Sequence, residues 1–362
     1  MVQGVYDAGW QALTARLDGL IDLEASARAR GALQRRRAVG SAADLLRLAF
    51  AFVLGRLSLR SLSAWASEQG LAELSDVALL KRLKGSADWL GDLVAALLAV
   101  RQPEAGLGLP DGRRLLAVDA TTVLPPGNPR AYWLIHTVFD IEAQRFTTVE
   151  PSDRHQPERL TCGGVCAGEI RLADRGYGRA EELVAVVEAG ADVIIRTGAN
   201  HLPLRDGQGR PLERARLCER AALEGTLDLA IQLRGRPTLP LRLILWPLPP
   251  AAAELARRQA RRNARRWGYK AGAEGLATSG CLMLVTSLPA DHWPAERVLA
   301  AYRLRWQVEL AFKRLKSIVG LEDLKAKDPD LARCWIHTAL LAGLLIDLDR
   351  PASPSETPDS PP

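Results

Sequence analysis

The sequence has no apolar run long enough to cross a membrane. Its longest apolar stretches, 93–100 and 339–346, fall well short of the roughly 18 residues that a membrane-spanning helix needs, and they indicate buried helices instead. The chain does not open with a basic segment followed by an apolar run, so we expect no signal peptide. These absences favour a cytoplasmic protein without a membrane partner.

Cysteine is scarce and irregularly spaced. The five cysteines are an odd number without the spacing of a disulfide framework, which indicates free thiols in a reducing compartment. Cys162 and Cys166 have the spacing of a metal-binding pair, but no second Cys or His pair follows at a usable distance. The five histidines form no cluster. We therefore expect neither a structural zinc site nor a catalytic histidine.

Lysine is also scarce, since only seven of the 48 basic residues are lysines. Arginine carries nearly all of the positive charge, which exceeds the negative charge by 6. Arginine favours bidentate contacts with phosphate, so this composition suits a nucleic-acid partner, although an arginine-rich coding bias explains it as well. With 48% hydrophobic and 25% charged residues, the chain has the composition of a globular protein. Its length is enough for about two or three domains.

The first part of the chain, residues 1–105, has the pattern of a helical domain. Two short helices are expected at 58–70 and 75–84, joined by a turn that contains Gly70. This layout fits a helix-turn-helix that binds DNA, and it equally fits an ordinary helical bundle. A segment rich in Pro and Gly, 102–112, marks the end of this region.

Beyond this segment the pattern changes to strands. Strand-like runs are expected at 115–118, 132–140, 145–149, 169–173 and 192–196, with an amphipathic helix at 179–189. Strands followed by alternating helix and strand indicate an α/β domain with a mixed sheet. A hairpin of 227–233 with 239–246 and a strand at 282–286 follow. The last residues, 347–362, are rich in Pro and Ser and are expected to be disordered.

Two aspartates come directly after strands of this α/β region. Asp119 ends the run 115–118, and Asp174 ends the run 169–173. Ligands of open α/β sheets collect at the carboxyl ends of the strands, so a carboxylate there can reach a cation or a substrate. Taken singly, each aspartate fits a simple turn cap just as well.

The strongest helical pattern, 294–319, carries a polar stripe. No Gly or Pro interrupts 302–316, so we expect one continuous helix there. At about 100° per residue, its polar positions fall within an arc of roughly 60°, opposite an apolar face; they are Tyr302, Arg305, Glu309 and Lys316. One carboxylate between two cations and a phenol suits a surface that meets a metal ion and phosphates together. Three carboxylates near one point would bind divalent cations that can drive in-line phosphoryl transfer.

These residues make the sequence resemble the bacterial DDE transposases of the insertion-sequence-four group. The hallmark of that group, Tyr-x2-Arg-x3-Glu-x6-Lys, is matched at every step by the polar stripe. Asp174 opens Asp-Arg-Gly-Tyr, and Asp119 stands in Val-Asp-Ala-Thr. The three acids are separated by 55 and 135 residues, which is also typical of the group. The resemblance covers residues from about 40 to 346.

The resemblance implies an α/β fold with a ribonuclease-H-like catalytic core in residues 106–346. A β-rich insertion at about 200–280 would interrupt this core, and the helical domain 1–105 would bind DNA. Asp119, Asp174 and Glu309 would form the catalytic triad and hold Mg²⁺ or Mn²⁺. The implied reaction is nicking of double-stranded DNA at terminal inverted repeats, then attack of the freed 3′-hydroxyl on target DNA, in a synaptic homodimer.

The resemblance also implies contacts with DNA outside the triad. Tyr302, Arg305 and Lys316 would lie near the cleaved phosphate, and Arg196 resembles a DNA-contacting arginine of the group. Trp246 is a candidate for stacking on a flipped base at a hairpin end, and it fits equally well as a cover for the core of the insertion. The sequence leaves the positions of two further acids, Glu158 and Asp140, open.

An arginine-rich helix, 254–267, gives an independent indication of DNA binding. The segment 254–270 carries a net charge of +6, which equals that of the whole chain. Arginines recurring every four residues place most of this charge on one side, where Arg258, Arg262 and Arg265 can neutralise phosphates. A solvated helix face explains the same pattern.

Two other functions fit the same residues. A metal-dependent DNA nuclease or resolvase would use the triad without strand transfer. A DNA-binding regulator derived from an inactive transposase would keep the fold alone. The three acids and the polar stripe are complete in this chain, which favours an active transposase.

Overall fold

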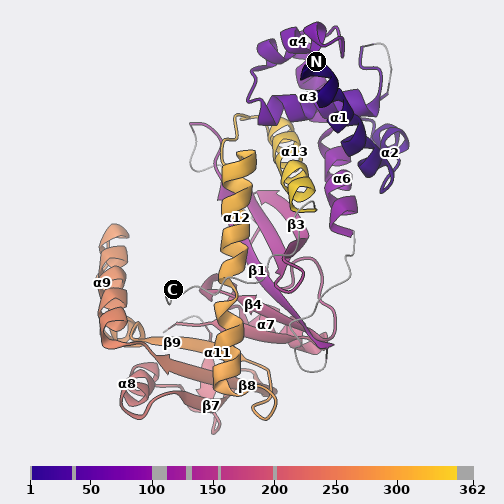
Figure 1. Cartoon of the computed structure of the whole chain (residues 1–362). Helices are drawn as coiled ribbons and strands as arrows, with labels where there is room; N and C mark the ends of the chain where they lie inside the picture. Colours follow the sequence, from indigo (N-terminus) through magenta and orange to yellow (C-terminus); the bar gives the residue numbers. More distant parts are fainter. Residues whose placement is uncertain are drawn as a thin grey trace.

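The computed structural model describes residues 2–34, 38–99, 112–127, 133–153, 156–198 and 202–348. In these ranges, a group of helices at the N-terminal end is followed by a large mixed sheet with helices on both faces (Figure 1). The expected boundary segment 102–112 lies almost wholly outside the described residues, and so does the Pro/Ser-rich tail from residue 349 onward. None of the described helices is both long and apolar enough to span a membrane.

Helices α1 to α6 come first in the described chain, with the bounds Val2–Asp18, Leu23–Ala29, Ala42–Leu54, Leu59–Glu68, Asp76–Gly85 and Ala87–Ala99. Helices α4 and α5 are the two short helices expected on either side of Gly70. Ser58 and Ser75 begin them, since each hydroxyl accepts a hydrogen bond from a backbone N–H of the first turn. The sequence pattern therefore predicted both helices and their starts.

Two basic side chains of α5 are engaged within the protein. Lys84 Nζ lies 2.8 Å from Asp328 Oδ2, and Arg82 donates to the backbone carbonyl of Ala32 at 3.2 Å. Lys81 is exposed. Binding of DNA by α4 and α5 stays a prediction.

The sheet has nine strands, β1 to β9, with the bounds Arg114–Val123, Trp133–Asp140, Arg145–Asp153, Glu169–Ala173, Asp192–Arg196, Leu204–Asp206, Leu227–Leu233, Arg236–Pro247 and Cys281–Thr286. Their order is β3-β2-β1-β4-β5-β9-β8-β7-β6. The first three strands in the chain pair antiparallel, and β4 and β5 continue parallel to β1. This is the ribonuclease-H-like arrangement that we expected.

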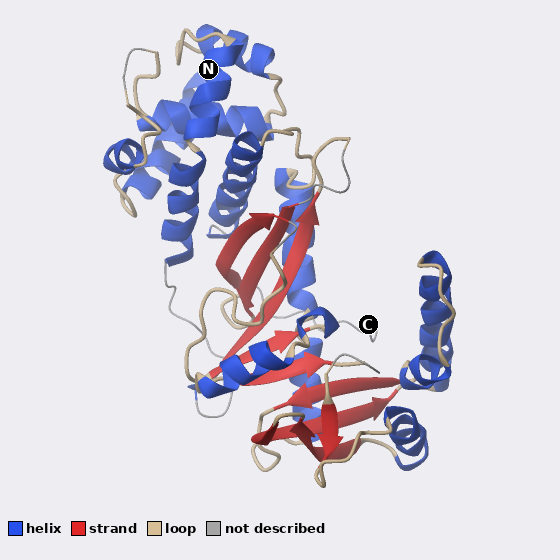
Figure 2. Cartoon of the chain, turned by 180° about the vertical axis from the view of Figure 1, so that it is seen from behind, coloured by secondary structure: helices blue, strands red, loops and turns tan. Residues whose placement is uncertain are grey.

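The strand-rich segment extends the same sheet. β7 and β8 form the expected antiparallel hairpin, and β9 pairs antiparallel with β8 on one side and β5 on the other. Helix α9 (Pro250–Arg266) and the short α10 (Ala273–Thr278) connect β8 to β9. Figure 2 shows α9 standing apart from the sheet.

Successive side chains along each strand point to opposite faces of the sheet, so a hydrophobic core forms on each face. On β1, Leu115 and Ala117 belong to one core, and Leu116 and Val118 belong to the other. Helices α7 (Ala180–Glu188) and α8 (Arg214–Glu224) cover the second core. The first core is continuous with the N-terminal helices, because α13 (Pro329–Leu348) packs among them; Trp335 meets Phe52 of α3 edge-on at 5.2 Å.

The expectation of one continuous helix through 302–316 is wrong. The structure has α11 (Ala295–Arg303) and α12 (Trp306–Val319), which follow one another along the sheet (Figure 1). At the break, Leu304 and Arg305 donate to carbonyls three residues back, at 3.1 and 3.0 Å, so the chain makes a tightened turn. Neither Gly nor Pro marks this turn, so a periodic pattern alone could not predict it.

The close contact between α12 and α13 generates a stability prediction. A methyl group on Gly343 of α13 would overlap Leu315 Cδ2 of α12. We expect Gly343→Ala to lower the free energy of unfolding by about 1–3 kcal/mol, since overpacking forces neighbouring groups to shift. Urea unfolding followed by circular dichroism measures the change. Gly85→Ala on α5 is the matched control, because nothing lies within 4 Å of its added methyl group. An equal loss of stability in both variants would contradict this packing.

Candidate active site

The register between two parallel strands directs Asp119 and Asp174 toward neighbouring positions. β1 pairs with β4 so that Ala117 stands opposite Leu172. Continuing this register by two residues brings Asp119 level with Asp174. Alternation places both aspartates on the sheet face of Ala117 and Leu172, which packs against α12. Pairing of β1 with β4 therefore brings together two aspartates that are 55 residues apart in the sequence.

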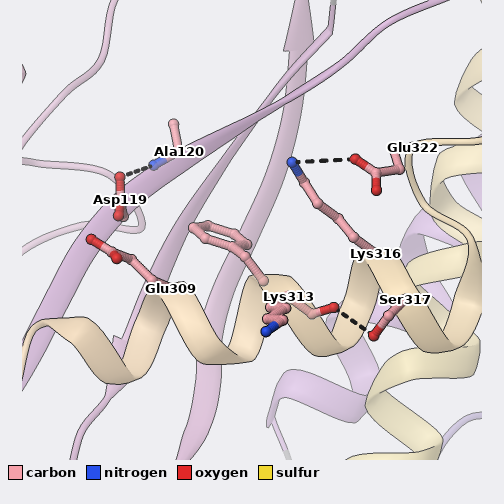
Figure 3. Close-up of a pocket in the computed structure, with 8 residues that line it drawn as sticks. Asp119, Ala120, Glu309, Lys313, Lys316, Ser317 and Glu322 are labelled. Carbon is pink, nitrogen blue, oxygen red and sulfur yellow. Dashed lines mark hydrogen bonds and ion pairs between the residues drawn. The ribbon is translucent and has the colours of Figure 1, made fainter. Parts of the chain in front are cut away.

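Glu309 approaches Asp119 from the first turn of α12. Arg305 begins this helix and donates from Nη1 to Asp119 Oδ2 at 3.2 Å and from Nη2 to Glu309 Oε1 at 2.5 Å. Figure 3 shows the Asp119 and Glu309 carboxylates pointing toward one another. One guanidinium thus joins two acids that are distant in sequence.

The pKa of Asp119 is raised by burial and, to a smaller extent, by the two other acids. Burial is the main reason that this pKa rises, from 3.8 to about 6. The backbone N–H of Ala120 and the charge of Arg305 lower it, whereas the negative charges of Asp174 and Glu309 raise it. The charges of Asp174 and Glu309 therefore both reach Asp119, although the three acids come from separate elements.

The donor set suits a divalent cation. Carboxylate oxygens are the ligands that Mg²⁺ and Mn²⁺ prefer, and the mutual repulsion of the acids is what such a cation relieves. As the side chains stand, no three acid, Cys or His groups of the described residues are close enough together to hold an ion. The guanidinium of Arg305 occupies part of the space between Asp119 and Glu309. Glu309 is 57% exposed, so its side chain has room to turn.

Tyr302 does not lie on an exposed stripe as expected. It is 7% exposed, and the Arg305 guanidinium lies 5.9 Å from the centre of its ring. The reason is the turn between α11 and α12, which changes the helical phase on which the stripe was predicted. Arg196 is exposed at the end of β5. Burial raises the pKa of Tyr302, and the charges of Arg305 and Arg196 oppose that rise. Burial and then the charge of Arg196 lower the pKa of Arg175. Arg175, the second residue of the Asp-Arg-Gly-Tyr motif, is close enough to Asp174 and Arg196 for their charges to act on it, although the sequence analysis gave it no role.

A hollow of about 510 Å³ runs from the acids along α12 (Figure 3). Its lining includes Asp119 and Glu309 at one end and Lys316 farther along. Lys316 Nζ lies 3.7 Å from Glu322 Oε2, an ion pair that the sequence did not suggest. The hollow thus has acids at one end and a cation at the other.

Other predicted residues lie away from this hollow. Trp246 is half-buried and packs against the first core, not against the core formed mainly by the inserted strands and α8. Asp140 is buried and accepts a hydrogen bond from Arg114 at 2.6 Å. Helix α9 stands apart from α12 in both views (Figure 1, Figure 2), and its arginines are exposed at Arg258, Arg262 and Arg265.

Comparison with known proteins agrees with this geometry. Residues 110–345 match the family described as the transposase DDE domain. The InsL protein of insertion sequence element IS186A from Escherichia coli (strain K12) is 42% identical over 348 residues, which cover 93% of each chain. The transposase for insertion sequence element IS421 from Escherichia coli is 42% identical over 349 residues, again 93% of each chain.

Among solved structures, the piggyBac transposase in a synaptic complex with hairpin DNA aligns over 89% of this chain and 70% of its own, with 9% identity and a TM-score of 0.46. The family match spans well over half of the sequence, and the two insertion-sequence relatives are similar along nearly all of it. The resemblance expected from the polar stripe and the two aspartates is confirmed: the chain belongs to the family of DDE-domain transposases.

Proposed function

We propose that this transposase cuts and joins DNA at a divalent-cation site formed by Asp119, Asp174 and Glu309. The proposal is carried by the meeting of the three acids, since strand register sets the two aspartates level and Arg305 links Asp119 to Glu309. The DDE domain implies dependence on a divalent metal ion. We propose Mg²⁺ as that ion, with Mn²⁺ as its substitute.

The acids have different surroundings, which suit different parts of the reaction. Asp119 is largely buried and held by the Ala120 N–H at 2.8 Å, so its orientation is fixed. Glu309 is exposed on the other side of the Arg305 guanidinium from Asp119, where its side chain can adjust to the substrate. A cation bound between them would activate the attacking water or 3′-hydroxyl and neutralise charge on the phosphate. The steps are nicking at the terminal inverted repeats and then joining of the 3′-hydroxyl to target DNA.

Cations around the acids would hold the DNA backbone. Arg305 and Lys316 are separated along α12 by about 16 Å, the rise of eleven residues, so DNA lying along this helix would meet both. Arg196 would contact a phosphate from the end of β5. Tyr302 is buried, so we propose that it acts on the DNA through Arg305. Stacking of Trp246 on a flipped base stays a prediction.

The partners are transposon-end and target duplexes, and a synaptic homodimer is the assembly that the family resemblance implies. DNA as the substrate places the protein at the bacterial nucleoid, within the cytoplasm. The N-terminal region, residues 1–105, is proposed to bind the ends, and residues 106–346 to carry the chemistry. The rival function is a nuclease with the same triad. Supplying pre-cut ends, target duplex and Mg²⁺ separates the two, because only a transposase joins the ends to the target.

Glu309→Gln tests the cation site. The amide keeps the shape of the side chain but removes its charge, so we expect DNA nicking in Mg²⁺ to fall at least about 100-fold. Binding of end DNA, measured by gel shift without metal, should change little. Glu219→Gln, on an exposed position of α8, is the matched control. A Glu309→Gln protein that nicks DNA at the wild-type rate would rule out this triad.

The raised pKa of Asp119 predicts a pH-dependent stability difference. The folded protein holds the Asp119 proton more tightly than the unfolded chain does, because the pKa rises from 3.8 to about 6. Its ionisation therefore destabilises the metal-free fold as pH rises through this window. Two pKa units correspond to about 3 kcal/mol, so Asp119→Asn should gain up to that amount relative to wild type between pH 4 and pH 7. Urea unfolding in EDTA measures it, and a difference independent of pH would contradict the crowded site.

The exposed arginines of α9 predict a change in salt dependence. Replacing Arg258, Arg262 and Arg265 by Ala should weaken binding to all duplexes, because arginine–phosphate pairs carry no sequence information. The slope of log K against log salt should fall by about 0.9 for each phosphate that the variant no longer neutralises. Replacing Arg216 and Arg220, which are exposed on α8, is the control. An unchanged slope in the α9 variant would exclude α9 from the DNA interface.

A further inference from the structure

A fourth carboxylate, Glu158, lies on the Asp174 side of the proposed triad. A methyl group built on Gly176 would overlap Glu158 Oε2 and lie 3.4 Å from Asp174 Oδ1. Asp174 is held there by the Gly176 N–H at 2.7 Å. Both carboxylates therefore face the same few ångströms of space beside a residue that has no side chain.

Hydrogen bonds from Arg171 hold the loop that carries Glu158. This arginine of β4 is 1% exposed and donates to the carbonyls of Leu160 at 2.6 Å and Cys162 at 2.8 Å. Thr161 is held as well, because its N–H and hydroxyl both donate to Glu182, at 3.0 and 2.8 Å. The position of Glu158 is thus set by the packing of its loop.

No cation neutralises Glu158 in the part of the chain that the structure describes. Arg305 pairs with Asp119 and Glu309, whereas the described residues provide no such pair for Glu158. Burial and the charge of Asp174 both raise the pKa of Glu158. Two carboxylates facing each other without a basic partner repel, and a bound cation would relieve that repulsion.

Tyr177 gives a second, independent indication of a missing partner. Its side chain is 2% exposed, and its hydroxyl has no hydrogen-bond partner among the described residues. Burial raises its pKa, and the charges of Asp119, Glu158, Cys162 and Asp174 raise it further, so the hydroxyl keeps its proton. A buried donor without an acceptor costs about 1–3 kcal/mol. A hydrated cation between the acids would supply both the acceptor and the charge.

We propose that Glu158 is a further carboxylate ligand of the divalent-cation site, beside Asp174. This inference rests on the proposed function and extends its set of three acids to four. Divalent cations such as Mg²⁺ and Mn²⁺ take several oxygen ligands, so a fourth carboxylate has a place in the site. Tyr177 then donates its hydroxyl to a water or carboxylate of the occupied site.

Gly176 provides a way to displace Glu158 without changing any charge. In Gly176→Ala the added methyl group takes the place of Glu158 Oε2. The backbone tolerates the change, because Gly176 is not among the glycines with positive φ. Glu158→Ala opens this space again, so Gly176→Ala should have no further effect in a Glu158→Ala background.

The test is Mn²⁺ binding to the full chain without DNA, followed by electron paramagnetic resonance of the free ion. Glu158→Gln should weaken the binding of one Mn²⁺ by about 10- to 100-fold. Gly176→Ala should weaken it in the same direction, and the Glu158→Ala/Gly176→Ala pair should match Glu158→Ala alone. The control Glu219→Gln should bind like wild type, and circular dichroism checks that each variant is folded.

Asp119→Asn separates this inference from the function on which it rests. If Asp119→Asn weakens Mn²⁺ binding while Glu158→Gln and Gly176→Ala bind like wild type, Glu158 is no ligand and the triad stands. If Asp119→Asn also binds like wild type, or if the wild type binds no Mn²⁺, the cation site itself is wrong. If Glu158→Gln does not fold, the Gly176→Ala titration decides in the same way.

Discussion

The guanidinium of Arg305 is the interaction that holds the candidate site in this arrangement. It lies 3.2 Å from Asp119 and 2.5 Å from Glu309, and its side chain is only 16% exposed. Without a cation there, a buried aspartate and a nearby glutamate would repel across a region of low dielectric. The turn between α11 and α12 gives Arg305 this position, because it sets the side chain at the start of α12 instead of on the flank of a longer helix. The irregular turn is therefore part of the site.

The sequence predicted the parts of the site that depend on local pattern. Asp174 directly follows β4 as expected, whereas the expectation that Asp119 ends its strand is wrong, because β1 continues to Val123. The β1–β4 register still brings the two aspartates to neighbouring positions. The four-residue spacing of Arg305 and Glu309 fits the ion pair that the structure shows, although the sequence analysis expected the two side chains to face phosphates and a metal ion. The expected hairpin, the mixed sheet and the capped helices are likewise local consequences of alternation, helical spacing and N-cap serines.

What the sequence did not predict depends on tertiary packing. The break before α12 carries no Gly or Pro, and it puts Tyr302 in the core when a continuous helix would have exposed it. The pairing of Lys316 with Glu322 and the position of Glu158 beside Gly176 join segments whose order in the chain gives no hint of proximity. The same holds for the way β9 joins the inserted strands to the core sheet. Such contacts are decided by which faces meet, and a periodic pattern cannot reveal that.

The balance of charge explains why arginines surround a group of acids. DNA is a polyanion, so carboxylates alone would repel the phosphate on which they have to act. Arg305 offsets two of the acids, while burial and then the nearby charge of Arg196 lower the pKa of Arg175. Holding like cations this close is unfavourable in the free protein, and an approaching phosphate would relieve it just as a divalent cation would relieve the crowded acids. In the function proposed above, the acids would meet the divalent cation and the arginines the phosphate, so each ligand would relieve the repulsion within one set of side chains.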